Sequence, residues 1–180
     1  MNLYILGGGT LGRFIADTAG ARQDVTVAGY LDDRHPEVTT INGTPVVGRF
    51  ADLDPAVHRH VAIGVGEPTD RKRLFEWSRS AGCLLPPIVH PHTVLSPAAT
   101  VGDGVIIGPY STVLSGSRIG DGCCLLAMVN INQDVEIQRW CLIGASCVIG
   151  NGAVLEEGSH LGMGRVLAPA ARLAAWSHAV

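Results

Sequence analysis

Positive charge is scarce in this sequence of 180 residues: Lys72 is the only lysine, and the formal net charge is -3. A protein that binds nucleic acid through its phosphates needs a basic patch or stripe, and this composition does not supply one. We therefore do not expect nucleic acid as a partner.

The sequence also lacks a long apolar run and a positively charged leader. Residues Met1 to Leu6 hold no basic side chain, and no apolar stretch reaches the roughly 20 residues that cross a bilayer. We expect neither a signal peptide nor a membrane span, and we expect a cytoplasmic location.

Cysteine and histidine do not fall at metal-ligand spacing, so we expect no metal. Three of the five cysteines, Cys123, Cys141 and Cys147, occupy the same position of the repeat described next. A buried thiol packs as a small hydrophobe, and we interpret these residues as core positions rather than as a disulfide framework.

A period of six dominates the sequence from Val89 onward. The first position of each hexad is Val, Ile or Leu fifteen times in succession, ending at Leu173, and the fifth position is small everywhere except at Arg165. Neither a helix, with its period of 3.6, nor a strand, with its period of two, explains this pattern. The chain must turn within each hexad.

The turn residues place the corner within each hexad. Every glycine after Val89 falls at the second or fourth position, and Pro91, Pro97, Pro109 and Pro169 fall at the third. This pattern is typical of a hexapeptide β-helix. It resembles the left-handed parallel β-helix of hexapeptide acyltransferases, in which three hexads form a triangular coil. Five coils then make a prism about 24 Å tall.

The N-terminal half has a different pattern, that of a Rossmann-like βαβ domain. A strand at Leu3–Leu6 runs into a glycine turn at Gly7–Gly12 and a helix that reaches Ala19, and a second strand at Val25–Leu31 ends in Asp32-Asp33. Such a turn brings backbone N–H groups to a phosphate, and the acid accepts from ribose hydroxyls. Alternatively, the glycines only let the strand and the helix pack closely.

A third strand, Val61–Val65, leads into a helix that we expect Thr69 to cap, with Arg71 in its first turn. A complete dinucleotide site needs two βαβαβ halves, and about 85 residues supply one. A mononucleotide, or a nucleotide that carries a sugar, therefore suits this domain better than a nicotinamide dinucleotide. A nicotinamide-dependent oxidoreductase is a further hypothesis, which rests on the glycine turn alone.

The order of these parts resembles the sugar O/N-acyltransferase family that includes bacillosamine-pathway and perosamine acetyltransferases. The resemblance rests on Gly7–Gly12, Gly29–Asp33, Ile41–Gly48, Ala62–Gly64 with Arg71, and Ile88–Pro91. It implies a nucleotide-sugar-binding domain at residues 1–85, a β-helix acyltransferase domain at 86–180, acetyl-CoA as co-substrate between neighbouring prisms, and a homotrimer.

The resemblance also implies site residues. It assigns the nucleotide-linked amino sugar to Gly7, Gly9, Thr10, Gly12, Asp32, Asp33, Gly64 and Arg71, and acetyl-CoA to Gly144, Asn151 and Gly162.

The catalytic corner departs from the family pattern. Val135 occupies the small inward position, so the family's histidine aligns with Gln133 and its acidic partner with Asp134. Glutamine has no titratable group and can orient a nucleophile without accepting its proton. Asn151, one coil later, carries a backbone N–H that can stabilise the thioester oxyanion.

Two functions follow from this corner. An amine attacks without a strong base, so we expect N-acetyl transfer to a nucleotide-linked amino sugar rather than O-acetyl transfer. The alternative is a catalytically impaired, trimeric binding or scaffold protein. His160 and His178 stack 18 residues apart but away from Gln133, and we interpret them as surface residues.

Overall fold

The computed structural model describes residues 1–179, and Val180, which ends the expected second domain, lies outside the described residues. The chain forms two compact units, Met1–Pro86 and Pro87–Val180. Within the described residues, no helix is long and apolar enough to span a membrane.

The N-terminal unit is Rossmann-like, as predicted. Its sheet has the strand order β3-β4-β2-β1-β5, with β1, β2, β4 and β5 parallel and β3 antiparallel to β4. The elements are β1 (Asn2–Leu6), α1 (Thr10–Gly20), β2 (Thr26–Leu31), β3 (Thr40–Ile41), β4 (Thr44–Gly48), the 3-10 helix η1 (Phe50–Asp52), β5 (His60–Ile63) and α2 (Pro68–Ser80).

Apolar spacing sets the packing of this unit. Leu11, Ile15 and Ala19 recur every four residues on α1 and are buried, so the helix covers the sheet with one face.

The prediction that Thr69 caps α2 is wrong. Glu67 is the N-cap and Pro68 the first helical residue, because proline suits a position whose N–H has no intrahelical partner. Thr69 already lies inside the helix.

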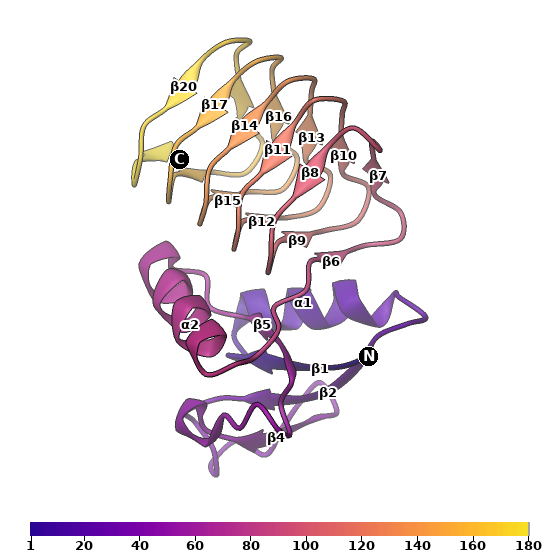
Figure 1. Ribbon diagram of the computed structural model, residues 1–180, viewed down its shortest axis with the longest axis vertical. Helices are drawn as coiled ribbons and strands as arrows, with labels where there is room; N and C mark the ends of the chain where they lie inside the picture. Colours follow the sequence, from indigo (N-terminus) through magenta and orange to yellow (C-terminus); the bar gives the residue numbers. More distant parts are fainter. Residues whose placement is uncertain (180) are drawn as a thin grey trace. The chain divides into compact units, whose positions relative to one another are not determined.

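The C-terminal unit is a prism of three parallel sheets (Figure 1). Face 1 holds β6 (Ile88–Val89), β9 (Ile106–Ile107), β12 (Cys124–Leu125), β15 (Leu142–Ile143), β18 (His160–Leu161) and β21 (His178–Ala179). Face 2 holds β7 (Val94–Leu95), β10 (Thr112–Val113), β13 (Asn130–Ile131), β16 (Val148–Ile149) and β19 (Val166–Leu167). Face 3 holds β8 (Thr100–Val101), β11 (Arg118–Ile119), β14 (Glu136–Ile137), β17 (Val154–Leu155) and β20 (Arg172–Leu173).

One coil takes 18 residues, since Thr112 pairs with Asn130 and every other prism strand pairs with the same offset. The strands occupy the sixth and first positions of the hexad. From Gly104 to Trp176, every fourth position has a positive φ, glycine or not. The predicted corner is therefore a left-handed residue at position four.

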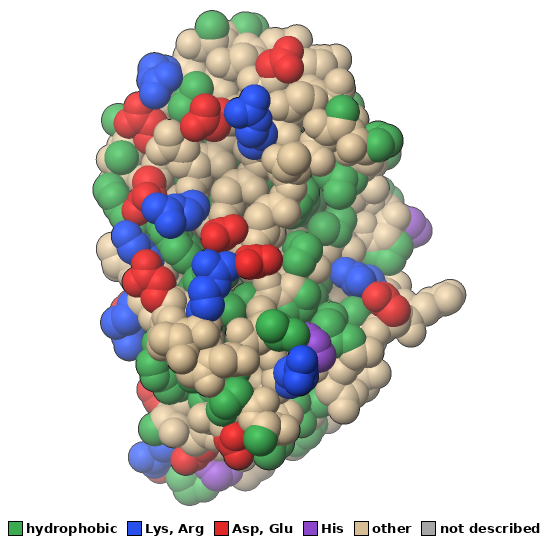
Figure 2. Space-filling model, viewed as in Figure 1, with side chains coloured by type: hydrophobic (Ala, Val, Ile, Leu, Met, Phe, Trp, Pro, Cys, Tyr) green, Lys and Arg blue, Asp and Glu red, His purple; other side chains and the backbone are tan. Residues whose placement is uncertain are grey.

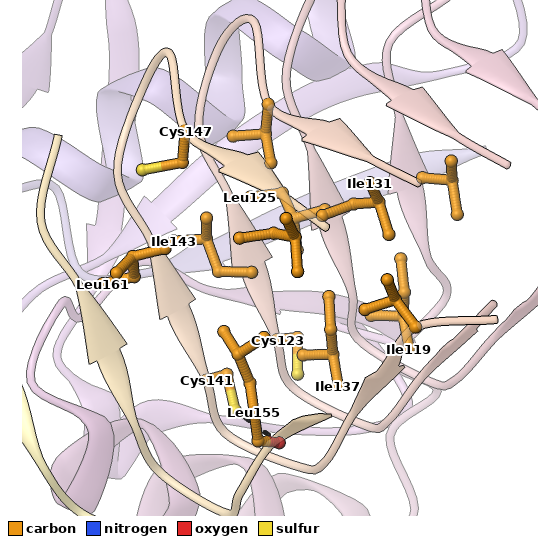
Figure 3. Packing of buried hydrophobic residues seen from close by; sticks show 14 of the residues in the cluster. Ile119, Cys123, Leu125, Ile131, Ile137, Cys141, Ile143, Cys147, Leu155 and Leu161 are labelled. Carbon is orange, nitrogen blue, oxygen red and sulfur yellow. Dashed lines mark hydrogen bonds between the residues drawn. The ribbon is translucent and has the colours of Figure 1, made fainter. Parts of the chain in front are cut away.

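The core of the prism consists of the first and fifth positions of the hexads, which Figure 3 shows as a continuous column of side chains. Ile107, Leu125 and Ile143 represent the first position, and Cys123 and Cys147 the fifth; all five are 0% exposed. The predicted role of the cysteines as core residues is confirmed, and burial raises the pKa of the Cys147 thiol.

The polar fifth-position residues also bond to the next coil. The Ser117 Oγ donates to the Asn132 carbonyl at 2.7 Å, the Cys123 Sγ to Gln138 at 2.9 Å and the Cys147 Sγ to Gly162 at 2.9 Å. Each acceptor lies 15 residues later, at the second position of a hexad. Serine and cysteine therefore suit the fifth position because they fill it and satisfy a carbonyl.

Two side chains differ from the expected pattern. Arg165 occupies an inward position yet is exposed, so its guanidinium needs no buried partner, while its carbonyl accepts from Val148 N at 2.9 Å in the regular ladder. Trp140, at the fourth position on a corner of the prism, is only 2% exposed. Its indole lies over Gly122, where a Cβ would overlap the ring.

Substitution of Ser117 tests the bond between coils. In Ser117→Ala, the Asn132 carbonyl loses its donor and the Val135 N–H, which donates to the Ser117 Oγ at 3.2 Å, loses its acceptor. We expect the free energy of unfolding to fall by about 1 to 3 kcal/mol. Ser117→Cys should recover part of the loss. Urea unfolding measures both, with the exposed Ser115→Ala as control; equal effects of Ser115→Ala and Ser117→Ala would contradict the role.

Candidate functional site

The glycine turn connects β1 to α1 and packs tightly against β5. Gly7 has a φ of 97°, and its N–H donates to the Leu31 carbonyl at 2.8 Å. A Cβ on Gly12 or on Gly64 would overlap the Gly7 carbonyl oxygen. These two glycines are therefore required for packing, whatever the turn binds.

The outer part of the turn is open. A Cβ on Gly9 would meet no atom within 4 Å, and both Gly9 and Thr10 are exposed. Helix α1 starts here without a side-chain cap and without an acidic residue in its first turn. Backbone N–H groups at such a helix start can receive an anion.

Asp32 lies at the carboxyl end of β2 and contacts the turn directly. Its Oδ2 accepts from the Gly8 N–H at 2.7 Å, and Arg34 donates through its backbone N–H at 3.0 Å, its Nε at 2.7 Å and its Nη2 at 2.8 Å. The residue is 6% exposed. The hydrogen bonds from the Arg34 side chain, supported by the Gly8 N–H, lower the pKa of Asp32 to about 2.

Two other predicted residues of this domain, Asp33 and Arg71, bond through their side chains to backbone groups of nearby loops. Asp33 is exposed, and its Oδ1 accepts from the Phe50 N–H at 3.0 Å at the start of η1. Arg71 is 3% exposed, and its Nη1 donates to the Gly66 carbonyl at 2.7 Å. Their contact with a ligand stays a prediction.

Arg34 was missed by the sequence analysis. The signal was present in the run Asp32-Asp33-Arg34, where a basic residue follows the acid pair at the end of a strand. The arginine reaches back to the first acid and lies beside the glycine turn.

The second candidate place is the prism corner at Gln133. The Asn151 Nδ2 donates to the Gln133 Oε1 at 3.1 Å, and the Gln133 carbonyl accepts from the Gly152 N–H at 3.0 Å. Within residues 1–179, no acceptor takes the backbone N–H of Asn151. The structure therefore stacks Gln133 and Asn151 as predicted and leaves an N–H available to an oxyanion.

Asp134 does not join this pair. It has a φ of 57°, and its Oδ1 lies against Gly116 in the preceding coil, whereas Gln133 bonds to the following coil. No hydrogen bond joins the side chains of Gln133 and Asp134 among the described residues. The reason is the left-handed fourth position, where Trp140 and Trp176 likewise lie over the preceding coil.

The two glycines assigned to acetyl-CoA belong to the coil ladder. Gly144 N–H donates to the Leu161 carbonyl, and Gly162 N–H to the Ala179 carbonyl, each at 2.8 Å. Their N–H groups are thus used. Gly144 is also buried, and a Cβ on it would overlap the backbone of Gly162 and Met163. Their role as cofactor contacts stays a prediction.

Face 3, which begins at the Gln133 corner, carries a hollow of about 540 Å³. Its lining includes Arg118, Asp121, Glu136, Gln138 and Arg139. Figure 2 shows side chains of both charge signs gathered over this face. Among the residues that the structure describes, no group of histidine, cysteine and acidic side chains could hold a metal ion.

Three sequence families match successive parts of the chain. Residues 2–78 match the family described as "PglD N-terminal domain", residues 98–133 "Bacterial transferase hexapeptide (six repeats)", and residues 139–169 "Hexapeptide repeat of succinyl-transferase". These matches confirm the predicted resemblance. A search of curated proteins finds no match.

Solved structures resemble the whole chain. A histidine-to-alanine variant of GDP-perosamine N-acetyl transferase from Caulobacter crescentus, in complex with CoA and GDP-perosamine, is 24% identical with a TM-score of 0.92, covering 99% of this chain and 85% of its own. The acetyltransferase domain of PglB from Neisseria gonorrhoeae, in complex with acetyl coenzyme A, is 23% identical with a TM-score of 0.75, covering 97% and 91%. WeeI from Acinetobacter baumannii is 18% identical with a TM-score of 0.72, covering 96% of both chains.

These likenesses show the fold, a Rossmann-like domain followed by a left-handed parallel β-helix of hexapeptide repeats.

The ion pair at Asp32 predicts a pH dependence of stability. Because the pKa of Asp32 is lowered to about 2 in the folded chain, its contribution, about 2 kcal/mol, is fully present above pH 5 and is lost as the pH falls through 2. Asp32→Asn removes it, so the difference from wild type in urea unfolding should shrink between pH 5 and pH 2. The exposed Asp17→Asn is the control, and a difference independent of pH would contradict the prediction.

Proposed function

We propose that this chain transfers an acetyl group from acetyl-CoA to an amino group of a nucleotide-linked sugar. The observation that carries the proposal is the order of parts: a PglD-like N-terminal domain precedes a hexapeptide β-helix, as in the relative whose structure contains both CoA and GDP-perosamine. The unit Met1–Pro86 would hold the nucleotide sugar, and the prism would hold acetyl-CoA at Gly144, Asn151 and Gly162.

The Gln133 corner supports an amine as the acceptor. In transfer to an amine, the nitrogen attacks the thioester carbonyl, the C–S bond breaks, CoA leaves as the thiol and an amide forms. Asn151 N–H is open to the oxyanion, and Gln133, held by the Asn151 side chain, can orient the nucleophile. No titratable group replaces the histidine at position 133, so a hydroxyl acceptor is less favoured.

A second candidate function is binding without transfer. The side chains of Gln133 and Asp134 point to different coils, which favours a chain that binds both ligands and has lost rapid catalysis. Two histidine variants of the Caulobacter relative hold CoA and GDP-perosamine, so replacement of a histidine in that protein is compatible with binding of both.

Mass spectrometry of reactions with acetyl-CoA and nucleotide-linked amino sugars tests the proposed transfer. In the same assay, Gln133→His restores a base, and general-base catalysis typically contributes about 10² to 10⁴ in rate. We expect a slow wild type whose kcat rises in Gln133→His, with a new ionisation near neutral pH and the largest gain for hydroxyl acceptors.

Two outcomes would contradict this account. If both proteins bind the ligands and form no product, the binding function stands and the transferase does not. If wild type is already fast and Gln133→His changes nothing, residue 133 does not govern the chemistry.

A homotrimer would cover the exposed apolar corner that Tyr110, Met128 and Met163 form, the last being 74% exposed. We expect a trimer mass by light scattering at micromolar concentration, and Met128→Glu should weaken assembly because it places a charge in the contact. A monomeric wild type would contradict both the trimer and an acetyl-CoA site between prisms.

A further inference from the structure

The carboxylate of Asp32 has no acceptor position left for a ligand. A carboxylate offers about four lone-pair sites. Gly8 N–H takes one, and Arg34 takes three through its backbone N–H, Nε and Nη2, at 2.7 to 3.0 Å. A ribose hydroxyl could bond to Asp32 only if Arg34 moved away, so the role predicted from the sequence does not fit this geometry.

Arg34, in contrast, has hydrogen-bonding groups left for a ligand. Its side chain is 55% exposed, and of the five guanidinium N–H donors only two are directed to Asp32, through Nε and Nη2. The Nη2 lies 3.4 Å from the place of a Cβ on Gly8, so the guanidinium rests against the glycine turn. Three N–H donors of this largely exposed side chain are therefore not used by Asp32.

We propose that Arg34 contacts the phosphate of the nucleotide-linked sugar and that Asp32 is a positioning residue. This inference rests on the proposed function and names the part of the substrate that the N-terminal unit reads. Asp32 fixes one edge of the guanidinium and, through Gly8, the turn, which leaves the other edge for phosphate oxygens.

A held arginine suits this task better than a mobile one. The guanidinium loses little rotamer freedom when the phosphate arrives, because the Asp32 carboxylate has already oriented it. A ligand without phosphate gains nothing from this arrangement.

The test compares nucleoside diphosphates with nucleosides by calorimetry. The probes are GDP, UDP, guanosine, uridine and acetyl-CoA, since CoA carries phosphates as well. Arg34→Ala should weaken binding of the diphosphate that wild type prefers by about 10-fold to 100-fold, the range for a lost charged hydrogen bond, and leave the nucleoside and acetyl-CoA unchanged. Arg34→Lys should recover only part, because it lacks the planar fork.

The chain offers a matched control. Arg22 and Asp24 form an ion pair with the same sequence spacing and with N–O distances of 3.0 and 2.7 Å. Arg22→Ala should leave diphosphate binding unchanged. Asp32→Asn should reduce the preference for diphosphate over nucleoside, a readout that a merely structural role would not move. Circular dichroism confirms that each variant is folded.

The outcomes separate this inference from the proposed function. If wild type binds a diphosphate and Arg34→Ala binds it equally, the assignment of Arg34 is wrong and the transferase proposal stands. If Arg34→Ala loses affinity for nucleoside and diphosphate equally, Arg34 only supports the turn. If it loses affinity for acetyl-CoA alone, Arg34 contacts a phosphate of CoA instead. Either result overturns the assignment. A wild type that binds no nucleotide or nucleotide sugar removes the proposed function and this inference together.

Discussion

The left-handed residue at the fourth position of the hexads, from Gly104 to Trp176, is the constraint on which the prism depends. Because the chain turns there, short strands stack 18 residues apart, and the first and fifth positions point inward. The same backbone directs fourth-position side chains onto the preceding coil, as Trp140 on Gly122 and Asp134 on Gly116 show. An L-residue with positive φ is strained, so the coils on either side must hold it.

The period of six predicted the strands, the inward positions and the buried cysteines, because each depends on the local turn alone. The bonds from Ser117 and Cys123 to carbonyls 15 residues later depend on how coils stack, which no single hexad encodes. The burial of Trp140 was missed for the same reason: glycine at position 122 leaves room for the indole only once the coils are superposed.

In the N-terminal unit, the sequence predicted the elements of the candidate site better than the contacts between its residues. Strand, glycine turn, helix and terminal acid were all predicted, and the structure brings Gly8 and Asp32 to 2.7 Å. The sequence pattern could not show that Arg34 competes with a ligand for the Asp32 carboxylate. Arg34, two residues later, occupies most of the carboxylate, and Gly12 and Gly64 are required for packing against Gly7. A motif identifies residue types, and the hydrogen-bond count decides which of them still has capacity for a ligand.

The same reasoning applies to the corner at Gln133. In the family pattern, a histidine and an acid occupy neighbouring positions, yet neighbours in sequence at positions three and four point to opposite coils in this chain. The side chains of Gln133 and Asn151, both at the third position, bond to each other across one coil. An amide pair in that place is rigid and neutral, and it leaves the Asn151 N–H free of protein acceptors in the described chain. Such a corner can orient a nucleophile and stabilise an oxyanion but cannot remove a proton. It therefore favours an acceptor whose neutral form is already a good nucleophile, as that of an amine is and that of a hydroxyl is not.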